Sequence, residues 1–354
     1  MIEAHTLDAW TRAADRGTIG FRNATVLGGF AAPLFLWLAG LACVLSATRA
    51  AEKSGSRSAA LDAICRRGLE IFVLAFLFRL QAFVVSPGSH PITLFRVDIL
   101  NIMGPAIVGG GIIWWSTTSA RRQAAAFAAV TAVIAMMTPV VRESTTVNAL
   151  PTWVQWYIRP AGEHTTFTAF PWIAFVFAGG ACGSLLAAAR GGHERRVHVG
   201  LAVTGAALVA AGFYASTLPT IYAHSSFWTS SPTWFAIRVG ILQLGLAAIF
   251  LVEQLASSPS PQSPGPVSAF LLSWQRPLAT LGRNSLFVYW IHVELVYGYA
   301  SWLWRGRLPL WGMAVGWLAF TTLMYWVVIL SAGFRDRRRI GSGNRRWNPA
   351  ARHA

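Results

Sequence analysis

Long apolar stretches separated by short polar segments run through almost the whole chain. Stretches of about 20 apolar residues are long enough to cross a hydrocarbon core of about 30 Å. Nine such stretches occur, at 24–48, 66–86, 97–116, 122–140, 168–189, 197–218, 234–255, 284–303 and 310–332. The first 15 residues contain too few apolar positions for a span, and alternation of the spans requires them to form the outer half of a helix. The pattern therefore predicts an all-α protein, a polytopic transmembrane helix bundle with nine full spans plus an N-terminal half helix.

The composition agrees with a membrane protein. Hydrophobic residues make up 55% of the chain and charged residues 12%, and the mean hydropathy is +0.49, outside the range of soluble globular proteins. The net charge of +16 would suit nucleic acid, but the basic residues are divided among the connecting segments in the way that sets membrane topology. The expected partners are therefore membrane lipids, and no nucleic acid.

The distribution of Lys and Arg predicts the orientation. When the C-terminus is placed in the cytoplasm, 19 of the 29 basic residues fall on the inner side, eight on the outer side, and two, Arg79 and Arg238, inside spans. The inner segments are 49–67, 117–122, 190–196, 256–283 and 333–354. Because cytoplasmic loops carry an excess of Lys and Arg, we expect a multi-pass protein of the cell (inner) membrane with a cytoplasmic C-terminus.

We predict a single transmembrane domain over residues 1–332. A Pro/Ser-rich linker at about 256–268 separates its last two spans from the others. The remaining residues, 333–354, form a basic cytoplasmic tail, which is typical of topogenic, lipid-attracted ends.

The stretch LGRNSLFVYWIHVEL, residues 281–295, places His292 and Glu294 in an apolar helix. An ionisable residue at bilayer depth costs about 2.5–3.5 kcal/mol on insertion scales, so it usually faces a protein interior or a wet cavity. The alternative is a pair of residues at a helix end near the membrane interface.

The N-terminal half helix carries His5, Asp8, Arg12 and Arg16 at spacings of three or four residues, which places them on one helical face. Such a stripe at the outer mouth of a bundle is suited to substrate binding or proton chemistry. An ordinary solvated helix end would show the same spacing, and the two interpretations stay open.

Other polar residues have both structural and functional interpretations. Arg79 either extends toward the outer interface or pairs with a carboxylate on a neighbouring helix. Asp98 begins a predicted helix and is suited to cap it, whereas Arg96 is freer to reach a ligand. The small residues Ala39 and Gly40 allow close helix packing. The three cysteines lack metal-like spacing and suit packing positions, so no metal site is expected.

Four motifs occur in a familiar order: MIEAH at the start, APLFLWLAG at 32–40, FRVDILNIMG at 95–104 and LGRNSLFVYWIH at 281–292. In this order they resemble the integral-membrane acyltransferases related to heparan-alpha-glucosaminide N-acetyltransferase, including bacterial members of that family. The resemblance extends over nearly the whole chain.

The resemblance implies transfer of an acetyl or related acyl group from cytoplasmic acetyl-CoA or another acyl-CoA to an amine or hydroxyl of an extracytoplasmic acceptor. That acceptor would be a small molecule or a glycan, and a homodimer is left open. His5 matches the reactive histidine of the family and would act as general base or transient acyl carrier, with Asp8 orienting it. The residues expected to bind substrate or assist are Arg12, Arg96, Asp98, Arg283, Asn284, His292 and Glu294.

The chain departs from the family pattern before His5. Family members carry a basic, Arg-Gly-containing segment there, and this sequence lacks it. We therefore expect Met1 to be an internal methionine of a longer first helix.

Two other classes of protein fit the same composition. Intramembrane ionisable residues also mark the pathways of proton-coupled transporters and flippases. Transporters of the common folds contain two related halves, and no such repeat is visible in this sequence. A non-catalytic membrane protein is the second alternative.

The predicted topology can be tested with reporter fusions. Fusions after Arg196 and after the C-terminal tail should report a cytoplasmic location, and fusions within 141–168 and 219–233 an external one, because the basic residues concentrate on one side. A cytoplasmic result for 141–168 would invert the orientation and place His5 on the other side of the membrane.

Overall fold

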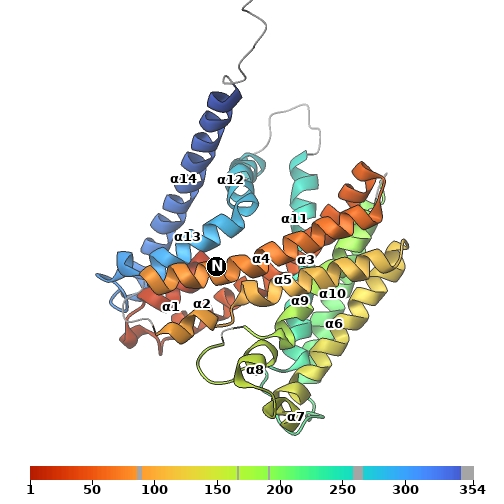
Figure 1. The fold of residues 1–354 in the computed structure, drawn as a ribbon, viewed down its shortest axis with the longest axis horizontal. Helices are drawn as coiled ribbons and strands as arrows, with labels where there is room; N and C mark the ends of the chain where they lie inside the picture. The colour runs from red at the N-terminus through yellow and green to blue at the C-terminus, as the bar shows by residue number, and fades with distance from the viewer. Residues whose placement is uncertain (86–89, 166, 190–191, 258–265, 344–354) are drawn as a thin grey trace, which may run out of the picture. The chain divides into compact units, whose positions relative to one another are not determined.

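The computed structural model describes residues 1–85, 90–165, 167–189, 192–257 and 266–343 (Figure 1). Within these residues the protein is helical and has no β-strand. Eight helices are long and apolar enough to cross a membrane. The prediction of an all-α, polytopic transmembrane helix bundle is confirmed.

The chain divides into two compact units. Unit 1 comprises residues 1–28 and 256–354, and its helices are α1 (Ile2–Trp10), α2 (Ile19–Gly28), α12 (Pro266–Arg283), α13 (Ser285–Tyr297) and α14 (Leu310–Gly343). Unit 2 comprises residues 29–255, and its helices are α3 (Ala31–Ser54), α4 (Arg57–Val85), α5 (Ile99–Ser116), α6 (Ala120–Glu143), α7 (Thr145–Asn148), α8 (Thr152–Ile158), α9 (Ala169–Ala187), α10 (Glu194–Ser216) and α11 (Pro232–Ser257).

Eight of the nine predicted spans coincide with long apolar helices, and the ninth is shorter than expected. In place of a span over 284–303, α13 ends at Tyr297 after 13 residues. Gly298 leaves the helical conformation, with φ −81° and ψ −167°, and the Ser301 hydroxyl donates to the carbonyl oxygen of Val296 at 2.6 Å. This side chain satisfies a carbonyl at the helix end, which is how a helix can stop without leaving a buried acceptor unpaired.

Parts of two predicted segments fall on residues that the structure does not describe. Within the Pro/Ser linker these are 258–265, and within the basic tail 344–354. The first half of the tail continues α14 as far as Gly343. The assignment of residues 1–332 to one domain stays a prediction.

Unit 2 is built around close contact between α3 and α9. A Cβ atom on Gly40 would overlap the carbonyl oxygen of Val176, and one on Gly179 would overlap that of Trp37. The two backbones therefore approach each other where both helices have glycine. Small residues permit this approach in membrane helices, and the packing role expected for Gly40 is confirmed.

Arg79 on α4 forms an ion pair with Asp98 at the start of α5. Asp98 is the N-cap of α5, and the side chain of Asn101 accepts a hydrogen bond from the Asp98 backbone N–H at 2.9 Å. Of the two interpretations of Arg79, pairing with a carboxylate is thus confirmed. Asp98 also has the capping position that its sequence context favoured.

The segment between α6 and α9 contains the short helices α7 and α8 and is tied together by Arg159. Only 8% of this side chain is exposed. Its guanidinium donates to the carbonyl oxygen of Arg142 at 2.7 Å and to Gln155 Oε1 at 2.9 Å, and it also bonds Asn148. One buried cation therefore satisfies acceptors from α6, α7 and α8.

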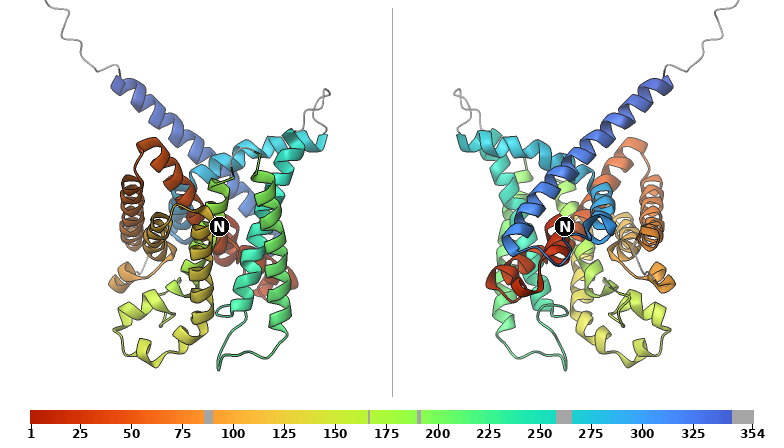
Figure 2. Two further views of the ribbon diagram at one scale, coloured as in Figure 1. Left: turned by 90° about the vertical axis from the view of Figure 1, so that its right-hand side faces the viewer. Right: turned by 90° about the vertical axis from the view of Figure 1, so that its left-hand side faces the viewer.

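In unit 1, α1 packs against α13 and α14 (Figure 2). The chain after α1 pairs with the segment before α14, where Arg12 N donates to Leu308 O and Leu308 N to Trp10 O, each at 2.9 Å. The indole of Trp10 is 4% exposed and contacts Phe320 edge-to-face at 5.5 Å. Helices shorter than about 12 residues are marginal alone, so these contacts hold α1 in place.

We expect Gly40→Ala to lower the free energy of unfolding of the purified protein by about 1–3 kcal/mol, as is usual for overpacked cores. Its melting temperature should fall accordingly. The added methyl group would overlap the Val176 carbonyl. Gly200→Ala is the matched control, because a Cβ there has nothing within 4 Å. Equal stability of the two variants in a detergent melting assay would contradict close α3–α9 contact.

Candidate active site

His5 and Asp8 lie one turn apart on α1 and meet the same residue of α13. The hydroxyl of Tyr297 donates to Asp8 Oδ2 at 2.8 Å, and its oxygen lies 3.2 Å from His5 Nδ1. The two aromatic rings meet edge-to-face, with centroids 5.5 Å apart. The three side chains therefore form a continuous chain of hydrogen bonds from carboxylate to imidazole.

This geometry fixes the direction of each hydrogen bond. The single hydroxyl proton of Tyr297 is directed to the Asp8 carboxylate, which can only accept when ionised. The tyrosine oxygen is then left to accept from His5 Nδ1–H. A neutral imidazole that carries its proton on Nδ1 has its lone pair on Nε2. The site therefore presents His5 Nε2 as a base or nucleophile.

A second histidine stands beside the first. The rings of His5 and His292 have centroids 5.2 Å apart, and His292 is 1% exposed. His292 Nδ1 lies 2.6 Å from the carbonyl oxygen of Val288 and must donate, since a carbonyl only accepts. Its Nε2 has no hydrogen-bond partner within the described part of the chain. Both imidazoles thus carry their lone pair on Nε2.

The polar stripe expected on the first helix is shorter than the sequence suggested. α1 ends at Trp10, and Thr11 is extended with ψ 129°. The prediction that Arg12 and Arg16 share a helical face with His5 is therefore wrong. Local spacing could not show that the chain leaves the helix to pair with Leu308.

Beyond the helix the two arginines have other partners. Arg12 pairs with Asp15 at 3.0 Å. Arg16 donates to the backbone carbonyls of Thr11, at 3.3 Å, and Asp8. The second oxygen of Asp15 accepts from the backbone N–H of Leu310 at 2.7 Å. These bonds hold the loop after α1 against the start of α14.

Three further predicted residues lie along α12 and α13. Arg283 is the exposed last residue of α12, and Asn284, the N-cap of α13, donates its side-chain amide to Thr280 O at 2.9 Å. His292 is eight residues beyond Asn284, about 12 Å along a helix axis, so Asn284 and His292 occupy different levels of α13. Glu294 is half-buried and lies one turn before Gly298. The backbone carbonyl oxygen of Glu294 accepts a hydrogen bond from the Gly298 N–H at 2.8 Å.

Arg96 and Asp98 belong to unit 2, at the connection between η2 (Pro91–Phe95) and α5. Asp98 is buried in its ion pair with Arg79, and Arg96 is half-buried. Their role in substrate binding stays a prediction, as do those of Arg12, Arg283, Asn284 and Glu294.

Tyr297 is the residue of this candidate site that sequence reasoning missed. A tyrosine at the end of an apolar helix is typical of the membrane interface, and it lies 292 residues from His5 in the chain. The only signal is its position five residues after His292, which does not place the two side chains on one face.

The pKa of Asp15 lies below its usual value of 3.8, first because the Arg12 side chain donates to the carboxylate and second because the Leu310 N–H does. A lowered folded-state pKa stabilises the fold above the unfolded-state value, and this contribution is lost as the pH falls through the folded-state pKa. We therefore expect the stability of the wild-type protein to decrease as the pH is lowered below about 4. Asp15→Asn should be less stable at neutral pH and should lose less on acidification.

Melting temperatures at pH 7 and pH 3.5 measure this difference. Because Asp15 acts at the loop after α1, the paired variant Arg12→Gln should reproduce part of the loss at pH 7. An Asp15→Asn protein with the wild-type pH dependence would contradict the assignment.

Comparison with protein families supplies an independent finding. The model for the catalytic domain of heparan-alpha-glucosaminide N-acetyltransferase matches residues 5–224, from His5 through α10. The match covers more than half of the chain, and α13 lies outside it. Among curated proteins, none matches this chain significantly. The multi-pass helical fold and this match together show that the chain belongs to the heparan-alpha-glucosaminide N-acetyltransferase catalytic-domain family.

Proposed function

We propose that this protein is a membrane-embedded acyltransferase that moves an acetyl or similar acyl group from cytoplasmic acyl-CoA to an amine or hydroxyl of an extracytoplasmic acceptor. Membership of an acetyltransferase family supports the reaction class. The observation that carries the proposal is the Tyr297 hydroxyl between Asp8 and His5, since it leaves Nε2 of His5 ready to react. A sugar is the acceptor that the family match favours.

His5 can serve this reaction in two ways. As general base, Nε2 takes the proton from the acceptor while the acceptor oxygen or nitrogen attacks the thioester carbonyl. The carbon–sulfur bond breaks, and the coenzyme A thiolate leaves. As acyl carrier, Nε2 itself attacks the thioester, and the acyl-imidazole then passes its acyl group to the acceptor. In both routes Nδ1 keeps its bond to Tyr297.

Asp8 and Tyr297 stabilise the state in which His5 gains charge. When Nε2 takes up a proton or an acyl group, positive charge develops on the imidazole. The Asp8 carboxylate lies one hydroxyl away and favours that charge, as the acidic member of a catalytic triad does. His292 packs beside the same ring, 1% exposed. The imidazole of His292 thus helps to keep water from His5.

The donor and the membrane orientation complete the proposal. The protein lies in the cell (inner) membrane with its C-terminus in the cytoplasm. Basic residues on the cytoplasmic side attract the phosphates of coenzyme A. Arg283 and Asn284 lie on that side, and Arg12 and Arg96 on the side of the acceptor. A homodimer is compatible with this arrangement.

We expect His5→Ala to abolish acyl transfer and His292→Ala to lower it less. Loss of a general base usually costs about 10²–10⁴ in rate, and loss of an obligate acyl carrier costs more. The measurement is transfer from radiolabelled acetyl-CoA in membrane vesicles, with the folded yield of each variant determined by size-exclusion chromatography. A well-folded His5→Ala protein with wild-type rates would remove His5 from the mechanism.

Tyr297→Phe separates positioning from chemistry in the same assay. This variant keeps the ring contact with His5 but lacks the hydroxyl that joins it to Asp8. Its kcat should fall and its pH–rate profile should shift, while the KM for acetyl-CoA stays the same. Label that remains on wild-type protein after denaturation, and is absent from His5→Ala, would select the acyl-carrier route.

A further inference from the structure

Two arginines lie inside predicted spans, and the structure gives them different surroundings. Arg79 on α4 forms an ion pair with Asp98. The side chain of Arg238 on α11 forms neither an ion pair nor a hydrogen bond within the described residues. An arginine inside a span usually pairs with a carboxylate or a carbonyl, and one that does not is a candidate for ligand binding. Arg238 therefore needs an explanation that Arg79 does not.

Arg238 lies close to one end of its helix. α11 begins at Pro232, six residues or about 9 Å before Arg238 along the helix axis. The guanidinium stands over the ring of Trp234, one turn nearer the helix start, at 4.8 Å from the ring centroid. This cation–π contact offsets only part of the cost of the charge, and it leaves the N–H donors of the planar guanidinium for a hydrogen-bond acceptor.

Trp234 provides a second unpaired donor at the same place. Its side chain is 7% exposed, and its Nε1–H has no hydrogen-bond partner in the part of the chain that the structure describes. The Nε–H of Arg238 is shielded and unpaired in the same way. Buried donors are costly unless an acceptor binds them. Two such donors one turn apart, one of them charged, suit an anion that has more than one oxygen.

Aromatic rings from other segments of unit 2 surround this pair of residues. The ring of Trp234 has its centroid 4.8 Å from Trp228, 5.3 Å from Phe227 and 6.1 Å from Phe30. Trp228 is 54% exposed and Arg238 is half-buried, so a ligand can reach the guanidinium. Tryptophans at the end of a span are typical of the membrane boundary, which the predicted topology makes the outer one. The apolar rings also strengthen the attraction between a cation and an anion, because they lower the local dielectric.

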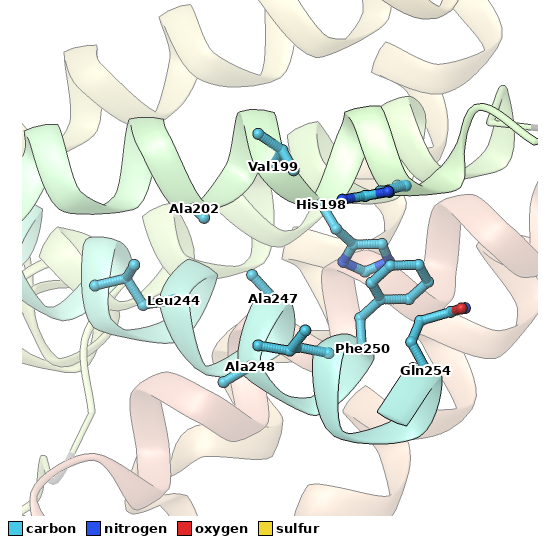
Figure 3. A pocket seen from close by; sticks show the side chains of 10 residues that line it. His198, Val199, Ala202, Leu244, Ala247, Ala248, Phe250 and Gln254 are labelled. Carbon is cyan, nitrogen blue, oxygen red and sulfur yellow. The ribbon is translucent and has the colours of Figure 1, made fainter. Parts of the chain in front are cut away.

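The apolar groove of about 510 Å³ between α10 and α11 lies elsewhere on the same helix (Figure 3). The two helices approach closely at Gly205 and Gly240, where a Cβ atom on Gly205 would lie 2.8 Å from the Gly240 carbonyl oxygen. On α11 the groove extends from Leu244 to Gln254, and its alanines line it without filling it. Arg238 is not among the lining residues. The groove is therefore separate from the unpaired donors.

We propose that Arg238 and Trp234 bind an oxyanion, a phosphate or carboxylate group, at the outer boundary of the membrane. The guanidinium supplies the charge and a planar fork of N–H donors, and the indole N–H adds a further donor. The headgroup of a phospholipid and a small solute both carry such a group. The proposal does not depend on the acyltransfer reaction.

Stability without added anion separates a ligand site from a structural contact. Arg238→Gln should melt at the wild-type temperature or above it, because the variant removes a charge that has no partner in the described structure. Arg79→Gln is the matched comparison and should melt at a lower temperature, because it leaves Asp98 buried and unpaired. A loss in Arg238→Gln as large as that in Arg79→Gln would overturn the proposal, since it would show that the guanidinium has a partner in the fold.

Binding is measured as the rise in melting temperature of the full-length protein in detergent. Sodium phosphate, sodium acetate and phosphatidylglycerol are the separate probes, with sodium chloride and a diacylglycerol of the same acyl chains as blanks. An anion that binds only the folded protein raises its melting temperature. Comparison with Arg238→Gln removes the general effect of salts on stability.

At least one probe should stabilise the wild-type protein, and also Arg22→Gln, which changes an exposed arginine outside the site. The same probe should not stabilise Arg238→Gln. Trp234→Phe keeps an aromatic ring but lacks the N–H, and it should bind that probe about tenfold more weakly. A response to phosphatidylglycerol alone identifies a lipid headgroup, and a response to phosphate or acetate identifies a solute. Equal responses of the wild-type protein and Arg238→Gln to all three probes would overturn the proposal.

Discussion

A buried polar group needs a polar partner inside the protein, and this constraint governs where the buried ionisable side chains of this protein lie. Arg79 meets Asp98 within unit 2. Asp8 and His5 meet through Tyr297 within unit 1. Removal of Arg79 or Asp98 would leave a buried charge unpaired, which is costly at low dielectric. At the second contact His5 is half-buried and Asp8 is exposed, so the hydrogen bonds there satisfy the imidazole of His5. Each polar group therefore constrains the helix that carries its partner.

Formation of the candidate active site depends on contacts between the two ends of the chain. α1 has nine residues and packs on α13 and α14. Its core partners include Val296, Met313 and Phe320. Contacts of such large sequence separation carry a high loop-closure entropy. The position of His5 is consequently fixed only when the last third of the chain has folded around α1.

The candidate active site and the contact between α10 and α11 depend on different physical features. At His5, hydrogen bonds select the tautomer that has its lone pair on Nε2. At α10 and α11, glycines hold the backbones together while alanines leave an opening. The first depends on polar groups satisfied in series. The second depends on missing side-chain volume.

The sequence by itself determined the fold class and eight of the nine predicted spans, because apolar length is a local property. His292 stood out as an ionisable residue in an apolar stretch, and His5 and Asp8 stood out by their helical spacing and by the family resemblance. Only the tertiary structure decided that Arg79 pairs with Asp98, that α1 stops at Trp10 and that Tyr297 joins Asp8 to His5. Each of these depends on segments distant in the chain. Helical periodicity relates residues three or four apart, and it contains no information on which helix faces another.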